Sequence, residues 1–436
     1  MTIQPDSIAG HLPTQQHRYL FALVDGGGTV PPELGTVRRL VDRGHDVTVL
    51  AEDSIADEAI ATGARFQRWA TAPNRASRHP DDDPYRDWEC KNPMQLFDRL
   101  LDKQFVGPAA EYAHDVTTMI EQHRPQLVVC TMFALGAMVA AEAADVPFDI
   151  MMPNVYLLPA DGMPPFGLGL QPAAGPLGRT RDRIISGFTE RSWAKGIDRL
   201  NALRDDYGLA PLDRLWDQAA RARRQLVMTS SSFDFPATLP DNARYVGAVL
   251  DDPRWGSTTT WTAPVDDRPL VLVGMSSTFQ DQHDSVQHVI DALGTLDVRG
   301  LVTTGPAIDP SVFTSHANVE VVAAAPHSQI LPHAALVVTH GGHGTVVKAL
   351  AAGVPLVILP HGRDQADNAA RITARGAGVK VKRTAKPAAI AKAIRRVLAD
   401  TSYREHAAAL GDDIRRDAAS GALTRELEDL AVTCDA

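Results

Sequence analysis

Short apolar runs alternate with helical segments along this chain, in two successive series. The first run, residues 18–24, stops at a glycine loop that begins with Asp25, and an amphipathic helix is expected over Glu33 to Arg43 because its apolar residues recur every three or four positions. A second apolar run, residues 46–51, follows. A strand, a helix and a further strand in this order form a parallel sheet. The alternation therefore predicts an α/β fold with doubly wound sheets.

Two such series imply two Rossmann-like halves that face each other across a cleft. Further strands are expected at 126–130 and 146–151 in the first series, and at 270–273, 300–303, 319–322, 335–338 and 356–359 in the second. The chain is accordingly divided into a flexible tail (1–16), a first half (17–247), a linker (248–268), a second half (269–402) and C-terminal helices that pack back across the junction (403–436). Ligands of parallel sheets bind beyond the carboxyl ends of the strands, so the cleft is the expected site.

Charge and cysteine usage exclude several classes of protein. The 43 Lys and Arg residues against 53 Asp and Glu residues give a net charge of −10, which disfavours nucleic acid and anionic lipid as partners. Cys90, Cys130 and Cys434 show no zinc or disulfide spacing. No signal peptide and no apolar run of about 18 residues is found. These features predict a cytoplasmic protein without a stable membrane anchor, and they leave the oligomeric state open.

The most informative segment covers residues 337–350, where an apolar strand leads into a glycine loop and a helix. The loop reads His340-Gly341-Gly342-His343-Gly344-Thr345. Glycines let a ligand approach the backbone, and the unpaired N–H groups of the first helical turn favour an anion, so a diphosphate fits this loop. Further on, Asp364 and Gln365 follow another strand. A carboxylate beside an amide suits the hydroxyl groups of a sugar.

Five blocks of this region, in order and spacing, resemble the donor-site signature of family-one glycosyltransferases, most closely the bacterial natural-product branch. The blocks are Pro326-His327, Leu331-Pro332-His333-Ala334-Ala335, His340 to Thr345, Ala352-Gly353-Val354-Pro355 and Asp364 to Ala369. The resemblance implies a GT-B fold whose first half binds a small-molecule acceptor and whose second half binds a nucleotide sugar. It also implies transfer of a hexose from a UDP- or TDP-sugar, with inversion and with neither a metal nor a further cofactor.

The resemblance assigns roles to individual residues of the second half. The nucleotide base would lie against Ala325, Pro326 and His327. The diphosphate would be held by Ser276, Ser277, Thr278, His340, Gly341, Gly342, His343, Gly344 and Thr345, and the sugar by Asp364 and Gln365. Lys348 departs from the family pattern, because it replaces a glutamate that often holds the ribose hydroxyls. This departure favours a deoxyribose donor or a phosphate contact by Lys348.

The first half departs from the family at its catalytic base. Thr29 stands where the family carries a His or Asp, and Thr131 stands where a supporting Asp is usual. A threonine hydroxyl cannot serve as a general base at neutral pH. Asp25 and Glu33 are the nearest acids in the sequence and are therefore the catalytic candidates. The alternative is an acceptor that needs little help, such as a phenol, whose pKa is about 10.

An apolar acceptor wall is expected in the segments 151–156 and 162–170, which follow a strand of the first half and are rich in Met and aromatic residues. The candidate pocket residues are Thr29, Met152, Asn154, Tyr156, Met163 and Phe166. Their character favours an apolar or phenolic acceptor. A long connecting loop without a binding role is the simpler interpretation of the same segments.

Other interpretations of these patterns carry less weight. A metal site at His340, His343 and His361 lacks helical ligand spacing, and the triple glycine at 26–28 lacks the third glycine of a dinucleotide fingerprint. The acidic run at 81–83 is typical of a solvated loop. Two rival functions remain on the same fold: a nucleotide-sugar epimerase or hydrolase, and a catalytically silent nucleotide-sugar binding protein.

Overall fold

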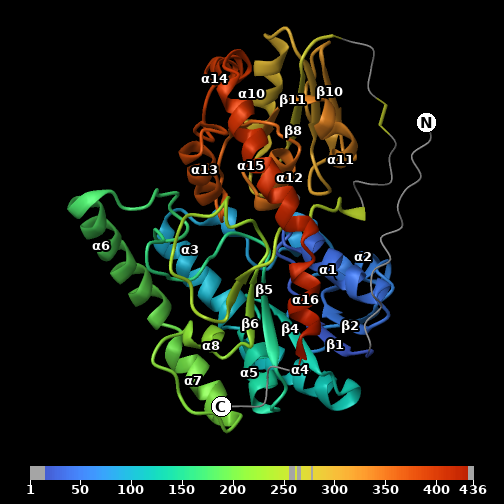
Figure 1. The fold of residues 1–436 in the computed structure, drawn as a ribbon, viewed down its shortest axis with the longest axis vertical. Coiled ribbons are helices and arrows are strands. Elements are labelled where there is room, and N and C mark those ends of the chain that lie inside the picture. The colour runs from blue at the N-terminus through green and yellow to red at the C-terminus, as the bar shows by residue number, and fades with distance from the viewer. Residues whose placement is uncertain (1–14, 255–260, 263–266, 276–277, 431–436) are drawn as a thin grey trace.

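A seven-stranded sheet, parallel throughout, forms the centre of the first half (Figure 1). The computed structural model describes residues 15–254, 261–262, 267–275 and 278–430. The strands, in sheet order, are β3 (Arg65–Arg68), β2 (Asp46–Ala51), β1 (Arg18–Ala22), β4 (Leu127–Thr131), β5 (Phe148–Met152), β6 (Arg224–Val227) and β7 (Ala243–Tyr245). The α-helices are α1 (Val30–Asp42), α2 (Ala56–Ile60), α3 (Pro93–Leu100), α4 (Ala109–His123), α5 (Leu135–Ala143), α6 (Gly175–Ala194), α7 (Ile197–Asp206) and α8 (Asp217–Ala220).

The second half repeats this architecture with a six-stranded parallel sheet. Its strands, in sheet order, are β10 (Val319–Val322), β9 (Arg299–Thr303), β8 (Leu270–Gly274), β11 (Ala334–Thr339), β12 (Leu356–Ile358) and β13 (Gly378–Lys380). Its helices are α10 (His283–Gly294), α11 (His327–Ile330), α12 (His343–Ala351), α13 (Gln365–Ala374), α14 (Pro387–Ala399), α15 (Ser402–Ala419) and α16 (Ala422–Glu428). The predicted α/β class with two doubly wound sheets is confirmed.

The differences from the expected elements lie at short or proline-containing segments. β3, β7 and β13 were not predicted, because runs of three or four residues carry too little periodicity to stand out. Helix α1 begins at Val30, three residues before the expected start, and takes Pro31 and Pro32 into its first turn. Proline is tolerated there because the first-turn N–H groups have no partner within the helix.

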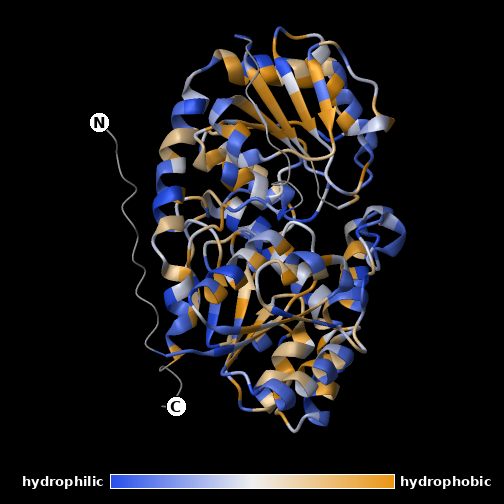
Figure 2. Ribbon diagram, turned by 90° about the vertical axis from the view of Figure 1, so that its right-hand side faces the viewer, coloured by the Kyte–Doolittle hydropathy of each residue, from blue (hydrophilic) through white to orange (hydrophobic). Residues whose placement is uncertain are grey.

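Each sheet is covered on both faces, which explains the continuous apolar runs in the sequence. In β1, Leu20 and Ala22 join the core on one face, whereas Tyr19 and Phe21 join the core on the other. Figure 2 shows the strands of the second half coloured mostly as hydrophobic. No helix among the described residues is both long and apolar enough to cross a bilayer.

The junction between the halves is a packed interface. Val155 and Phe233 of the first half are fully buried within the apolar cluster of the second half. Next to them, the guanidinium of Arg371 lies 2.7 Å from the Asp234 carboxylate, and both side chains are almost completely buried. Arg371 also stacks on the ring of Phe235 at 4.4 Å. The two halves are thus fixed to each other by apolar burial and by one enclosed ion pair.

The C-terminal helices return to the first half, as Figure 1 shows. Leu423 and Leu427 of α16 pack into the core beside α1. The Tyr19 hydroxyl donates a hydrogen bond to the Leu427 carbonyl oxygen at 3.2 Å, and Arg43 pairs with Glu428. This arrangement makes α15 and α16 a second connection between the halves, in addition to the linker.

Loss of the buried ion pair should strongly destabilise the junction. Arg371→Leu leaves the Asp234 carboxylate without its cation, and we expect the free energy of unfolding to fall by about 3–5 kcal/mol in urea titrations. Arg39→Leu is the matched control, because its partner Asp251 is half exposed, and its loss should be below about 1 kcal/mol. Equal losses in the two variants would contradict the structural role of the Arg371 pair.

Candidate functional site

The glycine loop between β11 and α12 has the backbone geometry of an anion site. Gly341 has a φ of +99°, and an added Cβ would lie only 2.7 Å from the side chain of Ile358. At Gly342 an added Cβ would lie 2.6 Å from Nε2 of His340. Both positions therefore require glycine, and α12 begins at His343 directly after them. At this positive end of the helix dipole, the His343 N–H donates to the Asp364 carboxylate at 3.3 Å.

The histidines predicted to bind the donor are neutral at pH 7. Burial lowers the pKa of His340 and of His343 to about 3 and that of His327 to about 4. The His343 Nε2 lies 2.9 Å from the Thr229 hydroxyl of the first half, and the His327 Nε2 lies 3.1 Å from the Thr303 hydroxyl. These side chains are hydrogen-bonding groups, and the charge of a bound diphosphate has to be balanced by other residues.

The two residues predicted to read the sugar differ in their surroundings. Asp364 brings the halves together, since one of its oxygens accepts hydrogen bonds from Asn154 at 2.9 Å and from Asn368 at 2.7 Å. Gln365 is almost fully buried, and its amide oxygen accepts the N–H groups of His361 and Gly362. Its amide nitrogen donates to Gln280 at 2.7 Å. In this conformation Gln365 stabilises the loop at 361–362 through hydrogen bonds, whereas Asp364 lies at the boundary between the two halves.

The other donor-side predictions fall into three groups. Ala325 and Pro326 are buried before α11, and Thr345 follows Gly344 in the first turn of α12. Ser276 and Ser277 lie outside the described residues. Lys348, predicted as a possible phosphate contact, turns instead to Asp252 of the linker at 3.3 Å, and Asp252 also accepts the Ser328 N–H. The sequence missed Asp252, because a linker acid carries no periodic signal.

The two candidate bases occupy opposite electrostatic environments. The Asp25 carboxylate accepts hydrogen bonds from the Gly27 N–H, the Ser54 hydroxyl and Arg78. Although burial opposes its charge, Arg78 and Arg75 hold its pKa below the usual value. Asp25 is therefore a structural anion within a buried ionic cluster. We assign Asp25 no role as a proton acceptor. Of the two predicted catalytic bases, Glu33 is left as the candidate.

Glu33 is fully buried, and neither of its carboxyl oxygens has a hydrogen-bond partner of standard geometry among the described residues. Burial raises its pKa to about 8; the nearby Thr131 hydroxyl offsets part of this effect, and the negative charge of Asp25 adds to it. Thr29, four residues earlier at the start of α1, also has an unpartnered buried hydroxyl, as does Thr131. This carboxyl group thus lies beside Thr29 and Thr131, the two positions at which the resemblance predicts a catalytic pair.

Most of the predicted acceptor wall is interior. Met152 and Tyr156 belong to the core of the first half, where the Tyr156 hydroxyl donates to Gln225 at 3.1 Å. Met163 accepts a hydrogen bond from Arg371, and Phe166 packs against the core of the second half. The prediction failed to distinguish these roles because buried and ligand-facing apolar residues look alike in a sequence. Of this set, Asn154 contacts Asp364, and Thr29 lies beside Glu33.

An aromatic cluster that the sequence did not identify lies on the other side of Thr29. A Cβ added at Gly26 would lie 2.9 Å from the Thr29 hydroxyl and 3.2 Å from the Phe133 ring, so these groups are adjacent. Phe133 contacts Phe105 edge to face, and Phe105 contacts Trp193 and Trp216 in the same way. The sequence could have indicated this cluster through Phe133, which follows the end of β4 by two residues.

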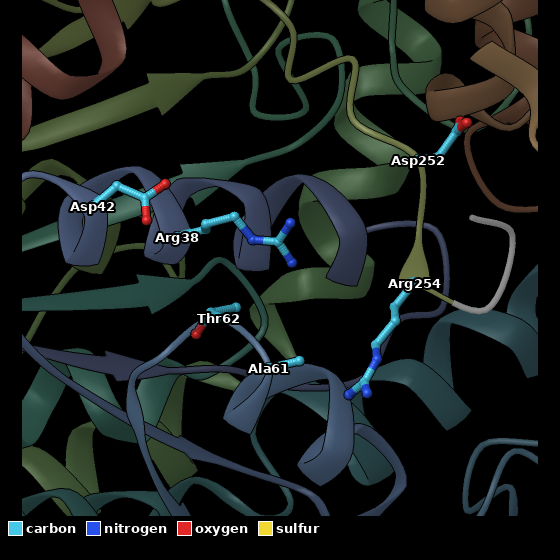
Figure 3. A pocket seen from close by; sticks show the side chains of 6 residues that line it. All are labelled: Arg38, Asp42, Ala61, Thr62, Asp252 and Arg254. Carbon is cyan, nitrogen blue, oxygen red and sulfur yellow. The ribbon is translucent and has the colours of Figure 1, made fainter. Parts of the chain in front are cut away.

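A separate open cavity of about 480 Å³ lies between α1, α2 and the linker. It is lined by Arg38, Asp42, Ala61, Thr62, Asp252 and Arg254. Figure 3 shows Arg38 and Asp42 on α1, with the Asp252 carboxylate pointing away from the other five side chains. None of the six belongs to the glycine loop, although Asp252 pairs with Lys348 of α12. Among the described residues no group of three His, Cys, Asp or Glu side chains is arranged to hold a metal ion.

Comparisons with known proteins agree with this geometry. Residues 287–430 match the model of the erythromycin biosynthesis protein CIII-like C-terminal domain. The 4'-demethylrebeccamycin synthase of Lentzea aerocolonigenes is 29% identical over 403 residues, which cover 91% of this chain and 95% of that protein. The structure of the calicheamicin glycosyltransferase CalG4 aligns with a TM-score of 0.74 at 25% identity, covering 97% of this chain and all of that one.

The chain is a glycosyltransferase. These matches support the family-one, natural-product group of such enzymes. It has the GT-B fold of the natural-product glycosyltransferases with which it aligns. The spinosyn rhamnosyltransferase SpnG, solved in complex with thymidine diphosphate, shares the fold with a TM-score of 0.64 at 20% identity over 95% of this chain and all of that one. These similarities favour a glycosyltransferase over the epimerase, the hydrolase and the silent binding protein.

The unpaired Glu33 should make this glycosyltransferase less stable as the pH rises. Its pKa is about 8 in the folded state and near 4.5 in the unfolded state, so between these values the folded state binds more protons. The free energy of unfolding should therefore fall from about pH 5 to about pH 8, by on the order of a few kcal/mol. Glu33→Gln should flatten this slope, measured by urea unfolding across the pH range.

A solvent-exposed glutamate on α4 supplies the control for this measurement. Glu121→Gln should leave the slope unchanged. Glu52, whose pKa burial also raises to about 8, keeps part of the slope in the Glu33→Gln variant. An identical slope in wild type and Glu33→Gln would mean that the Glu33 carboxyl is charged and satisfied in the folded protein.

Proposed function

We propose that this enzyme transfers a hexose from a UDP- or TDP-sugar to an apolar or phenolic small molecule, with inversion, without a metal ion and with Glu33 as the general base. The observation that carries the proposal is the buried Glu33 carboxyl beside Thr29 and Thr131, whose oxygens have no hydrogen-bond partner of standard geometry among the described residues. A group without a partner in the free enzyme is available to accept a proton from a ligand. Its pKa of about 8 lies close to the operating pH, where a general base is most effective.

The opposed location of base and leaving group supports inversion. Glu33 belongs to α1 of the first half, whereas the glycine loop and α12 belong to the second half. An acceptor activated by Glu33 would attack the anomeric carbon from the side opposite the diphosphate, and a single displacement inverts that carbon. As the bond to the sugar breaks, negative charge grows on the diphosphate, and each donor aimed at it contributes roughly 3–4 kcal/mol. In this proposal α12 and the side chains around it meet that charge, so no divalent ion is required.

The acceptor class is inferred from the groups around Thr29. Phe133 and the aromatic residues behind it offer ring faces and edges, which suit a flat aromatic acceptor. The raised pKa of Glu33 adds a second argument. A base that is largely protonated at pH 7 removes a proton more readily from a phenol, with a pKa of about 10, than from an aliphatic alcohol.

Removing the base should slow the reaction in a manner that depends on the acceptor. With Glu33→Gln we expect kcat to fall by about 10²- to 10⁴-fold for alcohols and less for acidic phenols. Wild-type kcat/KM should rise with pH up to about pH 8, and this rise should be lost in the variant. Nucleotide release with a series of phenols and alcohols, compared with release in the absence of acceptor, measures both effects.

Glu52→Gln is the matched control for the catalytic role of Glu33. Glu52 is equally buried, has a similarly raised pKa and accepts the Asp25 N–H, a contact that glutamine preserves. This variant should retain the wild-type pH profile. If Glu33→Gln keeps the wild-type rate and profile for every acceptor, the base is another group. If nucleotide is released at the same rate without acceptor, the enzyme is a hydrolase.

The glycine loop is tested through His340. His340→Ala removes a hydrogen bond to an anionic group, which contributes about 1.5–3 kcal/mol, so kcat/KM should fall roughly ten- to 150-fold. Because the pKa of His340 is about 3, the size of this loss should be the same at pH 6 and pH 8. A correctly folded variant with unchanged kcat/KM would remove His340 from the donor site.

A further inference from the structure

Arg363 connects the two halves at the edge of the donor site. It lies in the loop between β12 and α13, directly before Asp364. Its guanidinium makes two hydrogen bonds to Asp87 of the first half, from Nε at 2.7 Å and from Nη2 at 3.1 Å. The remaining nitrogen, Nη1, donates to the Thr278 hydroxyl at 2.9 Å. Thr278 belongs to the segment that the sequence predicts to hold the diphosphate.

The backbone of Arg363 is strained. Its φ of +54° lies in the left-handed region, which residues other than glycine and asparagine rarely adopt. Such a conformation costs roughly 1–3 kcal/mol and persists only where the surrounding structure enforces it, often at functional sites. The His361 and Gly362 N–H groups donate hydrogen bonds to the Gln365 amide oxygen, and these bonds hold the loop in this conformation. In this conformation the guanidinium reaches Asp87 of the first half and Thr278 of the second half.

The charges around the glycine loop single out Arg363. His340, His343 and His327 are neutral at pH 7, and Lys348 is paired with Asp252. Arg363 is close enough to His340 to lower its pKa. A nucleoside diphosphate brings about two negative charges or more into this site. Arg363 is a permanent cation beside the loop that can balance part of this charge; Arg371, which lowers the pKa of His343, is fully enclosed with Asp234.

Asp87 binds Arg363 in the way that a phosphate would. A guanidinium fork pairs bidentately with either a carboxylate or a phosphate, so the two anions are interchangeable partners. Asp87 belongs to a short 3-10 helix, Asp87–Glu89, that reaches across the cleft. The next residue, Trp88, packs edge to face on Phe279 with ring centroids 5.1 Å apart. This segment therefore covers the donor loop through both an ion pair and an aromatic contact.

We propose that Arg363 binds the terminal phosphate of the nucleotide diphosphate, and that Asp87 occupies this position until the phosphate displaces it. The terminal phosphate is the one next to the sugar, and Arg363 adjoins Asp364, the residue predicted to read that sugar. Displacement of Asp87 would also release Trp88 from Phe279 and open the segment over the donor loop. The proposal rests on the function proposed above, because it requires a nucleotide sugar in this cleft.

The test compares the affinities of UDP, TDP and the corresponding monophosphates for four proteins by calorimetry. Arg363→Gln should weaken binding of the diphosphates tenfold or more, and binding of the monophosphates by much less. Asp87→Asn should tighten diphosphate binding severalfold, since it removes the competing charge. Arg43→Gln is the control, because it breaks a comparable arginine–carboxylate pair, with Glu428, far from the donor loop.

The proposal requires opposite changes in diphosphate affinity: a loss in Arg363→Gln and a gain in Asp87→Asn. If Arg363 and Asp87 were only a structural brace, both substitutions would weaken binding, and mono- and diphosphates would be affected alike; that result overturns the proposal. Should Arg363→Gln fail to fold, Asp87→Asn still decides, since unchanged or weaker binding contradicts competition. If wild type binds none of the nucleotides, the proposed function fails as well. If wild type binds them and Arg363→Gln binds equally, only the role of Arg363 is lost.

Discussion

The cleft depends on polar groups at the carboxyl ends of two parallel sheets that are brought face to face. Asn154, after β5, bonds Asp364, after β12, and Thr229, after β6, contacts His343 at the start of α12. Such groups would be costly to bury without partners, so each half satisfies part of the other. The enclosed Arg371–Asp234 pair and the apolar cluster around Phe233 fix this register. The chemistry is therefore assembled by the junction, because neither half contains it alone.

Burial affects the acids of the first half in different ways. Asp25 and Glu33 are both inside the protein, yet arginines stabilise the charge on Asp25 while nothing comparable faces Glu33. The same desolvation therefore leaves one carboxylate a fixed structural anion and makes the other a weak acid with a pKa of about 8. The contrast arises from Arg75 and Arg78, which lie far along the chain from both acids. This contrast is the basis on which we propose Glu33, and not Asp25, as the proton acceptor.

Burial also affects the basic residues of the donor side in different ways. Buried histidines lose their charge, so they contribute direction and hydrogen bonds, and the helix end of α12 contributes a partial charge. The full positive charges in the neighbourhood are held by carboxylates from elsewhere: Lys348 by Asp252 of the linker and Arg363 by Asp87 of the first half. Each cation is thus paired with a carboxylate from another segment of the chain. Donor recognition and contact between the halves are consequently coupled.

Sequence periodicity by itself determined the two α/β halves, because a strand buried on both faces leaves a continuous apolar run and a crossover helix leaves a three-to-four spacing. The glycines themselves identified the loop at 340–345. The structure shows why they are needed, because the His340 ring and Ile358 crowd the backbone there. The roles of Met152, Tyr156, Gln365 and Lys348 were not readable, because an apolar or polar side chain has the same letter whether it faces a ligand or the core. The tertiary structure alone decided those roles, as it decided the difference between Asp25 and Glu33 and the pairing of Arg363 with Asp87. In each case the deciding partner lies in a distant segment, and its effect depends on burial, which is a property of the folded chain.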